Sequence, residues 1–211
     1  MLLQPLPPAA YAQLAQYVEL LSHWNQKMNL TAVRGPGVLV ALHLAECLRA
    51  AQRIPQGVET VLDFGSGAGL PGIPMQIARP ELCVTLAESQ KKKAAFLREA
   101  VRELGLGRAT VHAGRVEDLQ AEQVFDLVTL RAVDKMAEAL VAAFLRIHPP
   151  RGANLGWCIV LTAQPELGNI QPASNRPDAV SRPAAPRMDW LPPETVPGTH
   201  QRVILLGSRT R

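Results

Sequence analysis

VLDFGSGAGLPGIP, residues 61–74, carries the strongest fold signal in this chain. A short, mostly apolar run leads into Gly65, Gly67 and Gly69, an arrangement typical of a buried strand that ends in a sharp turn. Glycine adopts positive φ without strain and lets the backbone approach a ligand where a Cβ atom would clash. The stretch therefore predicts a strand followed by a glycine loop that holds a ligand at the edge of a sheet.

On either side of this loop, apolar runs and helical patterns alternate along the chain. The apolar runs are residues 60–64, 82–87, 109–113, 125–130 and 157–163, and the helical patterns cover about 70–79, 90–104 and 134–147. Such alternation is typical of βαβ units, in which helices cover the faces of a parallel sheet. We therefore expect an α/β, Rossmann-like core.

The N-terminal part of the chain has a purely helical pattern. Apolar side chains recur three and four residues apart between residues 8 and 31, and a second helix is expected over residues 38–51, after a Gly-Pro-Gly break. We therefore expect residues 1–56 to form a helical extension packed on an α/β domain of residues 57–211.

The C-terminal part is less regular. Many of the 18 prolines of the chain lie beyond residue 148, and residues 165–199 follow neither the helical nor the strand period. We expect an irregular, proline-rich segment there. Residues 200–207 then predict a final strand that returns to the sheet.

Composition limits the possible classes of protein. With 22 Lys and Arg against 18 Asp and Glu, the net charge is +4 and the sequence pI is near 9.3, which fits a polyanionic partner such as nucleic acid. Hydrophobic residues make up 47% of the 211 residues, enough for a packed core. No window approaches the roughly 18 apolar residues of a membrane span, so we expect a cytoplasmic protein.

The three cysteines give no sign of a metal or redox site. Cys47, Cys83 and Cys158 lie far apart in the sequence and form no CxxC pair. Widely spaced cysteines in odd number are typical of reduced, buried thiols in a cytosolic protein. We therefore expect no metal.

A carboxylate beyond the glycine loop points to a nucleoside ligand. Glu88 ends the apolar run 82–87 and follows Gly69 by nineteen residues. A carboxylate at the end of the second strand accepts the hydroxyl protons of a ribose. The spacing therefore predicts a nucleoside that lies across the strand ends.

Two nucleoside cofactors compete for this loop. Residues 67–72 satisfy G-x-G-x-x-G, the dinucleotide fingerprint, which is weak evidence alone. Pro71 and Pro74, however, remove N–H donors that a pyrophosphate would need, and Asp63 places a negative charge nearby. That charge suits the sulfonium and ammonium groups of S-adenosylmethionine. The residues favour S-adenosylmethionine over NAD, with an NAD-dependent oxidoreductase as the alternative and a purely structural glycine turn as a third interpretation.

Several motifs together resemble the small-subunit ribosomal RNA guanine-N7 methyltransferase family. They are Trp24-Asn25, Asn29-Leu-Thr31, LDFGSGAGLPGIP at 62–74, ESQKKKAAFLR at 88–98, Arg115-Val-Glu117 and Arg131-Ala132. The resemblance covers about residues 11–147. It implies a Rossmann-like S-adenosylmethionine-dependent methyltransferase fold with an N-terminal helical extension. It also implies methyl transfer to N7 of a guanine in the 530 loop of 16S ribosomal RNA, free or in the small ribosomal subunit.

The resemblance also implies a set of cofactor contacts. Carried over to this chain, they fall on Gly65, Leu70, Glu88, Val116, Glu117 and Arg131. Val116 and Glu117 are expected to grip the adenine, although Glu117 could instead complement a helix dipole. Arg131 is the candidate catalytic residue, because it ends a strand beside the glycine loop. The alternative for Arg131 is a structural ion pair with Asp126 or Asp134.

A cluster of basic residues is the candidate RNA-binding surface. Lys91, Lys92 and Lys93 open a helix, where the dipole disfavours positive charge, and Arg98 follows on the same helix. Phosphate would compensate that charge, although lysines of this kind also form ordinary solvated faces. We expect Trp24 to pack the first helix on the core and assign no role to His43.

The chain departs from the family pattern at several positions. Leu130 stands where the family has serine, Thr162 where it has lysine, and His43 to Cys47 reads HLAEC where the family has H-x-x-D-S. A degenerate, methyltransferase-like RNA-binding protein is therefore a further alternative. For the reaction itself, guanine N7 has an in-plane lone pair, so we expect no general base, nucleophilic cysteine or metal.

Overall fold

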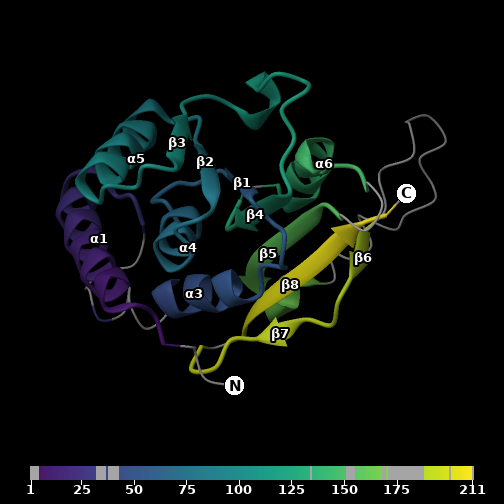
Figure 1. Cartoon of the computed structure of the whole chain (residues 1–211), viewed down its shortest axis with the longest axis horizontal. Helices are drawn as coiled ribbons and strands as arrows, with labels where there is room; N and C mark the ends of the chain where they lie inside the picture. Colours follow the sequence, from purple (N-terminus) through teal and green to yellow (C-terminus); the bar gives the residue numbers. More distant parts are fainter. Residues whose placement is uncertain are drawn as a thin grey trace.

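A computed structural model of the chain describes residues 5–31, 37, 43–133, 135–150, 155–167, 170, 188–199 and 201–210. It is built around one twisted sheet with helices on both faces (Figure 1). The helices α1, α3, α4 and α5 cover one face, and α6 covers the other. This confirms the predicted α/β class.

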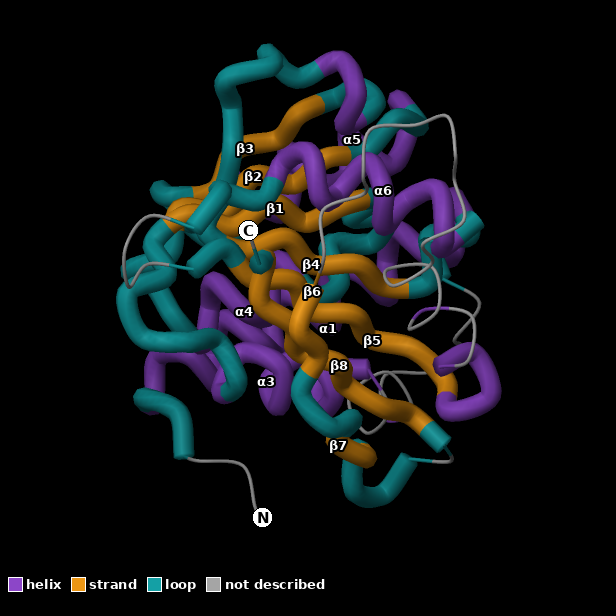
Figure 2. The backbone as a smooth tube through the Cα atoms, turned by 90° about the vertical axis from the view of Figure 1, so that its right-hand side faces the viewer, coloured by secondary structure: helices purple, strands orange, loops and turns teal. Residues whose placement is uncertain are grey.

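The sheet has eight strands in the order β3-β2-β1-β4-β5-β8-β6, with β7 also paired to β8. Its first five strands are parallel, and β8 is antiparallel to β5. In Figure 2 the strands follow one another from β3 at the top to β7 at the bottom. The bounds are Thr60–Phe64 for β1, Cys83–Ala87 for β2, Ala109–His112 for β3, Leu127–Arg131 for β4, Trp157–Ala163 for β5, Met188–Trp190 for β6, Glu194–Thr195 for β7 and Arg202–Arg209 for β8.

The strand order reverses at β1, which lies between β2 and β4. The chain leaves β1 toward β2 on one side, and returns later to place β4 on the other. Crossover connections therefore diverge at the carboxyl ends of these strands and leave a crevice between them, where open α/β sheets bind ligands. The glycine loop of residues 65–69 begins at this point.

In the described part of the chain, α3, α4, α5 and α6 pack against the sheet, and α1 packs on α4 and α5. The helix α4 connects β1 to β2, α5 connects β2 to β3, and α6 connects β4 to β5. The bounds are Pro8–Met28 for α1, Ala45–Gln52 for α3, Gly72–Ala78 for α4, Lys91–Glu103 for α5 and Met136–Arg146 for α6, with short 3₁₀ turns η2 at Val116–Asp118 and η3 at Gln164–Glu166. None of the helices in the described residues is long and apolar enough to cross a membrane.

Alternate side chains of the strands fill two hydrophobic cores. Val61 of β1 and Leu127 of β4 belong to the core under α1, α3, α4 and α5. Leu62 and Val128, one position further along the same strands, belong to the core under α6. The near-continuous apolar strands of the sequence therefore reflect burial on both faces.

The helix α1 is attached to the body by packing and by side-chain hydrogen bonds. Trp24 contacts Phe96 of α5 edge to face, with ring centroids 5.8 Å apart, which confirms its predicted packing role. Gln13 and Gln16 donate to the carbonyls of Leu104 and Glu103 at the end of α5. The division of the chain into residues 1–56 and 57–211 stays a prediction.

Two predicted segments differ from the structure. The second helix, expected over 38–51, is described as α3, and residues 38–42 lie outside the described residues. The prediction of an irregular segment over residues 165–199 is wrong in its last part, because β6 and β7 lie there. Residues 171–187 lie outside the described residues. Strands of two or three residues are too short to show a period. The final strand is confirmed, as β8.

The three cysteines are free thiols. Cys47 and Cys158 are fully buried, as predicted, whereas Cys83 is only partly buried, so the prediction of burial is wrong for Cys83. Burial raises the pKa of both buried thiols well above the ordinary value, so neither is a thiolate at neutral pH. Among the described residues, no group of three His, Cys, Asp or Glu side chains is placed to hold a metal ion.

Candidate functional site

The glycine loop follows β1 and turns sharply between the ends of β1 and β2. Gly65, Gly67 and Gly69 have φ of +69°, +56° and +88°, the left-handed region that favours glycine. The loop is held by backbone hydrogen bonds from Ser66 N to Ala87 O at 2.9 Å and from Gly69 N to Ser66 O at 2.7 Å. A Cβ at Gly67 would meet only the Gly65 carbonyl, at 3.8 Å, so the loop leaves open space beside this residue.

Asp63 lies behind the loop and lines neither cavity of the site. Its side chain is 1% exposed and accepts hydrogen bonds from Thr129 Oγ1 at 2.8 Å and from Gly72 N at 3.2 Å. Burial raises the pKa of its carboxyl to about 6, against these hydrogen bonds, which lower it. Asp63 therefore ties β1 to β4 and to the start of α4. Its predicted contact with a cationic ligand group stays a prediction.

The start of α4 offers few donors to a ligand. The N–H of Gly72 is engaged by Asp63, and the N–H of Ile73 donates to the Gly69 carbonyl at 2.8 Å. A dinucleotide site needs such N–H groups to be available for a pyrophosphate. This geometry does not favour NAD as the ligand of the loop.

Glu88 braces the loop from the end of β2. Its buried carboxylate accepts the N–H of Gly67 through Oε2 at 2.9 Å and the N–H of Gln90 through Oε1 at 2.7 Å. The same carboxylate lines a cavity in front of the loop. Glu88 is thus fixed by backbone donors while one side of it faces the space for a ligand.

Two cavities meet at the glycine loop. The first has a volume of about 360 Å³, the second about 330 Å³, and Gly65 lines both. The first is also lined by Leu30, Thr31, His43, Ser66, Gly67, Ala68, Leu70, Glu88, Lys93, Arg131, Ala132 and Arg202. The second is also lined by Phe64, Ala87, Ser89, Gly114, Arg115, Val116 and Glu117. The two cavities therefore lie on either side of Gly65, at the carboxyl end of β1.

The wall of the second cavity is held by a residue that sequence reasoning missed. Val116 and Glu117 lie in η2 and line this cavity, and their contact with the adenine stays a prediction. Arg146 of α6 is 8% exposed and donates to the carbonyls of Gln120 at 2.6 Å, Leu119 at 2.9 Å and Glu117 at 3.3 Å. Its guanidinium therefore fixes the turn that carries the cavity wall. A basic residue in an amphipathic helix gives no sign of this role.

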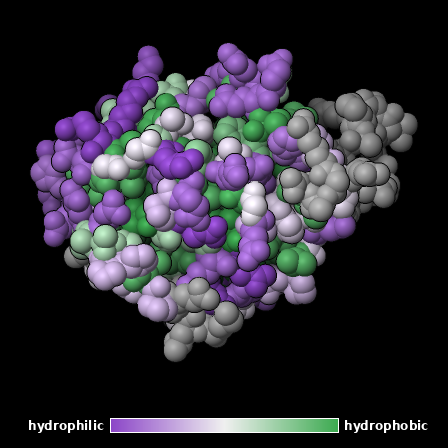
Figure 3. Space-filling model, in the orientation of Figure 1, coloured by the Kyte–Doolittle hydropathy of each residue, from purple (hydrophilic) through white to green (hydrophobic). Residues whose placement is uncertain are grey.

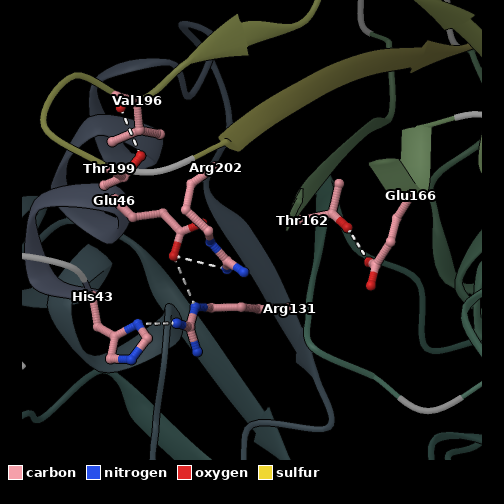
Figure 4. Close-up of polar contacts among 8 residues, drawn as sticks. All are labelled: His43, Glu46, Arg131, Thr162, Glu166, Val196, Thr199 and Arg202. Atoms are coloured by element: carbon pink, nitrogen blue, oxygen red, sulfur yellow. Dashed lines mark hydrogen bonds and ion pairs between the residues drawn. The ribbon is translucent and has the colours of Figure 1, made fainter. Parts of the chain in front are cut away.

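The far wall of the first cavity is an ion-pair cluster (Figure 4). The carboxylate of Glu46 is fully buried, with Arg131 Nε at 3.2 Å and Arg202 Nη2 at 2.8 Å. Arg131 also donates through Nη2 to Nδ1 of His43. Arg131, Arg202 and His43 line the cavity, whereas Glu46 lies behind them.

Asp126, one of the two alternative partners for Arg131, is engaged elsewhere. The Asp126 carboxylate accepts from Thr60 N at 2.9 Å and Thr60 Oγ1 at 2.8 Å, so it anchors the start of β1. Asp134 lies outside the described residues. The observed partners, Glu46 and His43, are more than eighty residues away in sequence. An ion pair of that kind can be found only from the fold.

The basic residues of α5 lie at the mouth of the first cavity and beyond it. Lys91, Lys92 and Arg98 are exposed, and Lys93 is half-buried and lines the cavity. Within the described residues, none of the three lysines has an ion-pair partner. Hydrophilic side chains crowd the edge of the molecule formed by α1 and α5 (Figure 3). Their contact with RNA stays a prediction.

Of the three departures from the family pattern, the one at His43 to Cys47 lies beside the first cavity, and those at Leu130 and Thr162 line neither cavity. Leu130 is fully buried in the core under α6. Thr162 is 2% exposed and donates through Oγ1 to Glu166 Oε2 at 2.5 Å (Figure 4). Leu130 is thus packed in an apolar core, and the hydroxyl of Thr162 has a hydrogen-bond partner.

Comparison with known proteins gives consistent matches. Residues 10–153 match the model of the family described as rRNA small subunit methyltransferase G. A protein of Xanthomonas euvesicatoria pv. vesicatoria with the name ribosomal RNA small subunit methyltransferase G is 48% identical over 146 residues, 69% of this chain and 68% of its own length. A protein of the same name from Xanthomonas campestris pv. campestris is 39% identical over 187 residues, 89% of this chain and 81% of its own length.

Solved structures show likeness of fold. A ribosomal protein L11 methylase from Lactobacillus delbrueckii subsp. bulgaricus aligns with a TM-score of 0.59 at 14% identity, covering 79% of this chain and 77% of its own. M. jannaschii TYW2 in complex with AdoMet aligns with a TM-score of 0.56 at 14% identity, covering 78% of this chain and 75% of its own. At this identity the likeness concerns the fold alone.

Proposed function

The chain belongs to the rRNA small subunit methyltransferase G family, and from that premise we propose that it transfers a methyl group from S-adenosylmethionine to N7 of a guanine in 16S ribosomal RNA. Membership of the family makes it an S-adenosylmethionine-dependent rRNA methyltransferase. The guanine, its N7 atom and its place in the 530 loop are the finer part of the proposal. A ribosomal substrate also leads us to expect the protein in the cytoplasm.

One observation carries the proposal most directly: two cavities share Gly65 as a lining residue, and the carboxylate of Glu88 lines the first of them. A nucleoside with a charged tail needs such a site, with a slot for the base, an acceptor for the ribose hydroxyls and a wider space beyond. Val116 and Glu117 would hold the adenine, and Glu88 the ribose. The open space beside Gly67 and the cavity wall at Leu70 would accommodate the rest of the cofactor.

S-adenosylmethionine supplies a methyl group bound to a positively charged sulfur, which needs no activation by the protein. Glu88, which accepts the N–H of Gly67, would hold the sugar together with the loop, and Asp63 fixes the start of α4 behind the loop. Arg131 also lines the first cavity, where it would bridge the cofactor and the RNA. It remains the candidate catalytic residue.

The acceptor atom decides what the protein must do. Guanine N7 offers an in-plane lone pair, so no proton has to be removed before transfer. The protein's task is then to align N7 with the methyl group, and positioning of this kind supplies roughly 7–11 kcal/mol. The base must leave its stack to enter the cavity. Lys91, Lys92, Lys93 and Arg98 would hold the phosphates around it.

The alternatives find less support. An NAD-dependent oxidoreductase is not favoured, because the N–H groups at the start of α4 are engaged within the protein. A degenerate, non-catalytic protein is not favoured either, because every predicted cofactor residue except Asp63 and Gly69 lines one of the two cavities.

The proposal is tested by following a labelled methyl group. The protein is incubated with labelled S-adenosylmethionine and either deproteinised 16S RNA or intact small subunits from a strain that lacks the modification, and the RNA is digested to nucleosides. We expect label in 7-methylguanosine at one position. Label in another nucleoside, or in protein, would contradict the proposal. The two substrates also show whether ribosomal proteins are needed.

A further inference from the structure

Three side chains in series end at the first cavity. Arg131 donates to the buried carboxylate of Glu46 through Nε at 3.2 Å, and to Nδ1 of His43 through Nη2 (Figure 4). Arg131 and His43 line the cavity, and Glu46 is fully buried. The carboxylate therefore fixes the guanidinium, and the guanidinium fixes the imidazole.

This arrangement decides which nitrogen of His43 carries the proton. A guanidinium has only donors, so Nδ1 of His43 must accept. A neutral imidazole with an accepting Nδ1 carries its proton on Nε2. Figure 4 shows Nε2 on the side of the ring away from Glu46, and within the described part of the chain it has no hydrogen-bond partner. His43 is thus a lining residue of the cavity with one N–H donor that no described residue engages.

The surroundings keep His43 uncharged. Burial, and after it the charges of Arg131 and Arg202, lower the pKa of His43 to about 4. Lys93 lines the same cavity and adds positive charge, and Glu46 is already shared by the two arginines. At neutral pH the imidazole is therefore a donor without a charge and has no tendency to take a proton from a substrate.

We propose that His43 donates through Nε2 to O6 of the guanine whose N7 accepts the methyl group, an inference that rests on the proposed function. Guanine presents O6 and N7 as adjacent acceptors on one edge, whereas adenine has an amino donor in place of O6. A donor at O6 selects guanine over adenine and fixes the orientation of the base, and therefore of N7. A neutral donor also adds no charge beside a base that becomes positive on methylation.

The proposal is tested by changing the base and the residue together. A small-subunit substrate is prepared with 2-aminopurine, which keeps N7 but lacks O6, at the position that the wild-type protein methylates. We expect single turnover at saturating cofactor to be roughly tenfold slower on 2-aminopurine than on guanine, as for the loss of one hydrogen bond. Inosine, which keeps O6 and lacks only the amino group, is expected to react at nearly the guanine rate.

In the second arm, His43→Phe removes the donor and keeps a flat ring. This variant is expected to react with guanine roughly tenfold more slowly than the wild type, and no more slowly with 2-aminopurine than with guanine. Two losses that multiply would overturn the proposal, because the base and the residue would then act independently. Equal wild-type rates on guanine and 2-aminopurine would overturn it without any variant.

Controls separate this role from folding and from the proposed function. His43→Gln has an amide that can accept from Arg131 and donate in place of Nε2, so it is expected to recover most of the rate. A His43→Gln rate no higher than that of His43→Phe, with unchanged cofactor affinity in both, would count against the donor role. Absence of any N7 methylation by the wild type would contradict the proposed function instead.

Discussion

Two buried glutamates are held in different ways: Glu88 lines the first cavity, and Glu46 lies behind the residues that line it. Glu88 accepts two backbone N–H groups, from Gly67 and Gln90, which lie within a few residues of β1 and β2. Glu46 accepts hydrogen bonds from the guanidinium groups of Arg131 in β4 and Arg202 in β8. The cofactor wall, defined by Gly65 to Leu70 and Glu88, is thus built from backbone. The acceptor wall, defined by His43, Glu46, Arg131 and Arg202, is built from distant side chains.

The difference assigns different tasks to the two walls. Backbone N–H donors do not move when a side chain changes its rotamer. The cofactor wall therefore has a fixed geometry and binds the cofactor with one affinity. Charged side chains in an ion-pair cluster carry spare donors, so the acceptor wall can hold a second substrate and a polyanion. Damage to the cofactor wall should therefore be seen in affinity for S-adenosylmethionine, and damage to the acceptor wall in the rate of transfer.

The largest effect is expected at the cofactor wall, from Gly67→Val. Gly67 has φ of +56° and faces the open space in front of the loop, so a branched side chain is strained and fills the place of the ligand. We expect no measurable cofactor binding by calorimetry. Gly105→Val is the matched control, because Gly105 has φ of +63° and also has open space beside it, but lines neither cavity. Equal loss of binding in both variants would show that strain alone explains the effect.

The next effect concerns the acceptor wall. Glu46→Gln leaves two guanidiniums without their shared carboxylate, and we expect the free energy of unfolding to fall by about 3 kcal/mol and methyl transfer to fail at saturating cofactor. The control is Glu194→Gln, because Glu194 also pairs with two arginines, Arg49 and Arg53, but lies outside the cavity. Its variant should lose stability in chemical denaturation while keeping transfer. Normal methyl transfer by a folded Glu46→Gln variant would show that the ion-pair cluster has no role in the reaction.

A smaller effect is expected at the basic residues of α5. Changing Lys91, Lys92 and Lys93 together to glutamate should weaken RNA binding roughly tenfold or more and flatten its dependence on salt, because phosphate contacts release counterions. Lys135→Glu, on the exposed side of α6, is the control for charge alone. Unchanged RNA affinity of the folded triple variant would show that the three lysines form only a solvated helix face.

The smallest effect is in the pH dependence of stability, where Asp63, behind the glycine loop, and His43, in the acceptor wall, should act in opposite directions. The pKa of Asp63 is raised to about 6, so its contribution to stability falls as pH rises from about 4 to 6; between pH 5 and 7 this loss is roughly 1 kcal/mol. The pKa of His43 is lowered, so its contribution is lost as pH falls from about 6.5 toward 4. Relative to the wild type, Asp63→Asn should gain stability with rising pH, and His43→Gln should lose it. The same sign in both variants, measured by urea unfolding, would contradict the assigned shifts.

The two walls also differ in how well the sequence alone predicts them. The glycine loop and Glu88 lie on strands with clear apolar runs, so their meeting at the sheet edge follows from βαβ topology. The same reasoning places Val116 and Arg131, because both follow parallel strands whose ends share that edge. The cofactor wall was thus predictable from contiguous segments of sequence.

The acceptor wall was not predictable in this way. Glu46 and His43 belong to the N-terminal helices, whose contact with β4 is set by tertiary packing and leaves no local pattern. Arg202 opens β8, the strand whose pairing with β5 depends on a long return of the chain. Asp63 could be placed near the loop, but whether it faces the ligand or the core depends on Thr129 and Gly72. Side-chain direction at a crowded strand end needs the fold.

The division of labour between the walls is tested most directly by single-turnover rates over a titration of S-adenosylmethionine, with Glu88→Ala and Arg131→Ala compared. Loss of hydrogen bonds to the charged Glu88 should cost roughly 1.5–3 kcal/mol of cofactor affinity, so excess cofactor should restore the wild-type rate. Arg131→Ala should remain slow at saturating cofactor, because the defect lies in presentation of the RNA. Full recovery of Arg131→Ala at high cofactor would contradict the account and leave Arg131 as a cofactor-binding residue only.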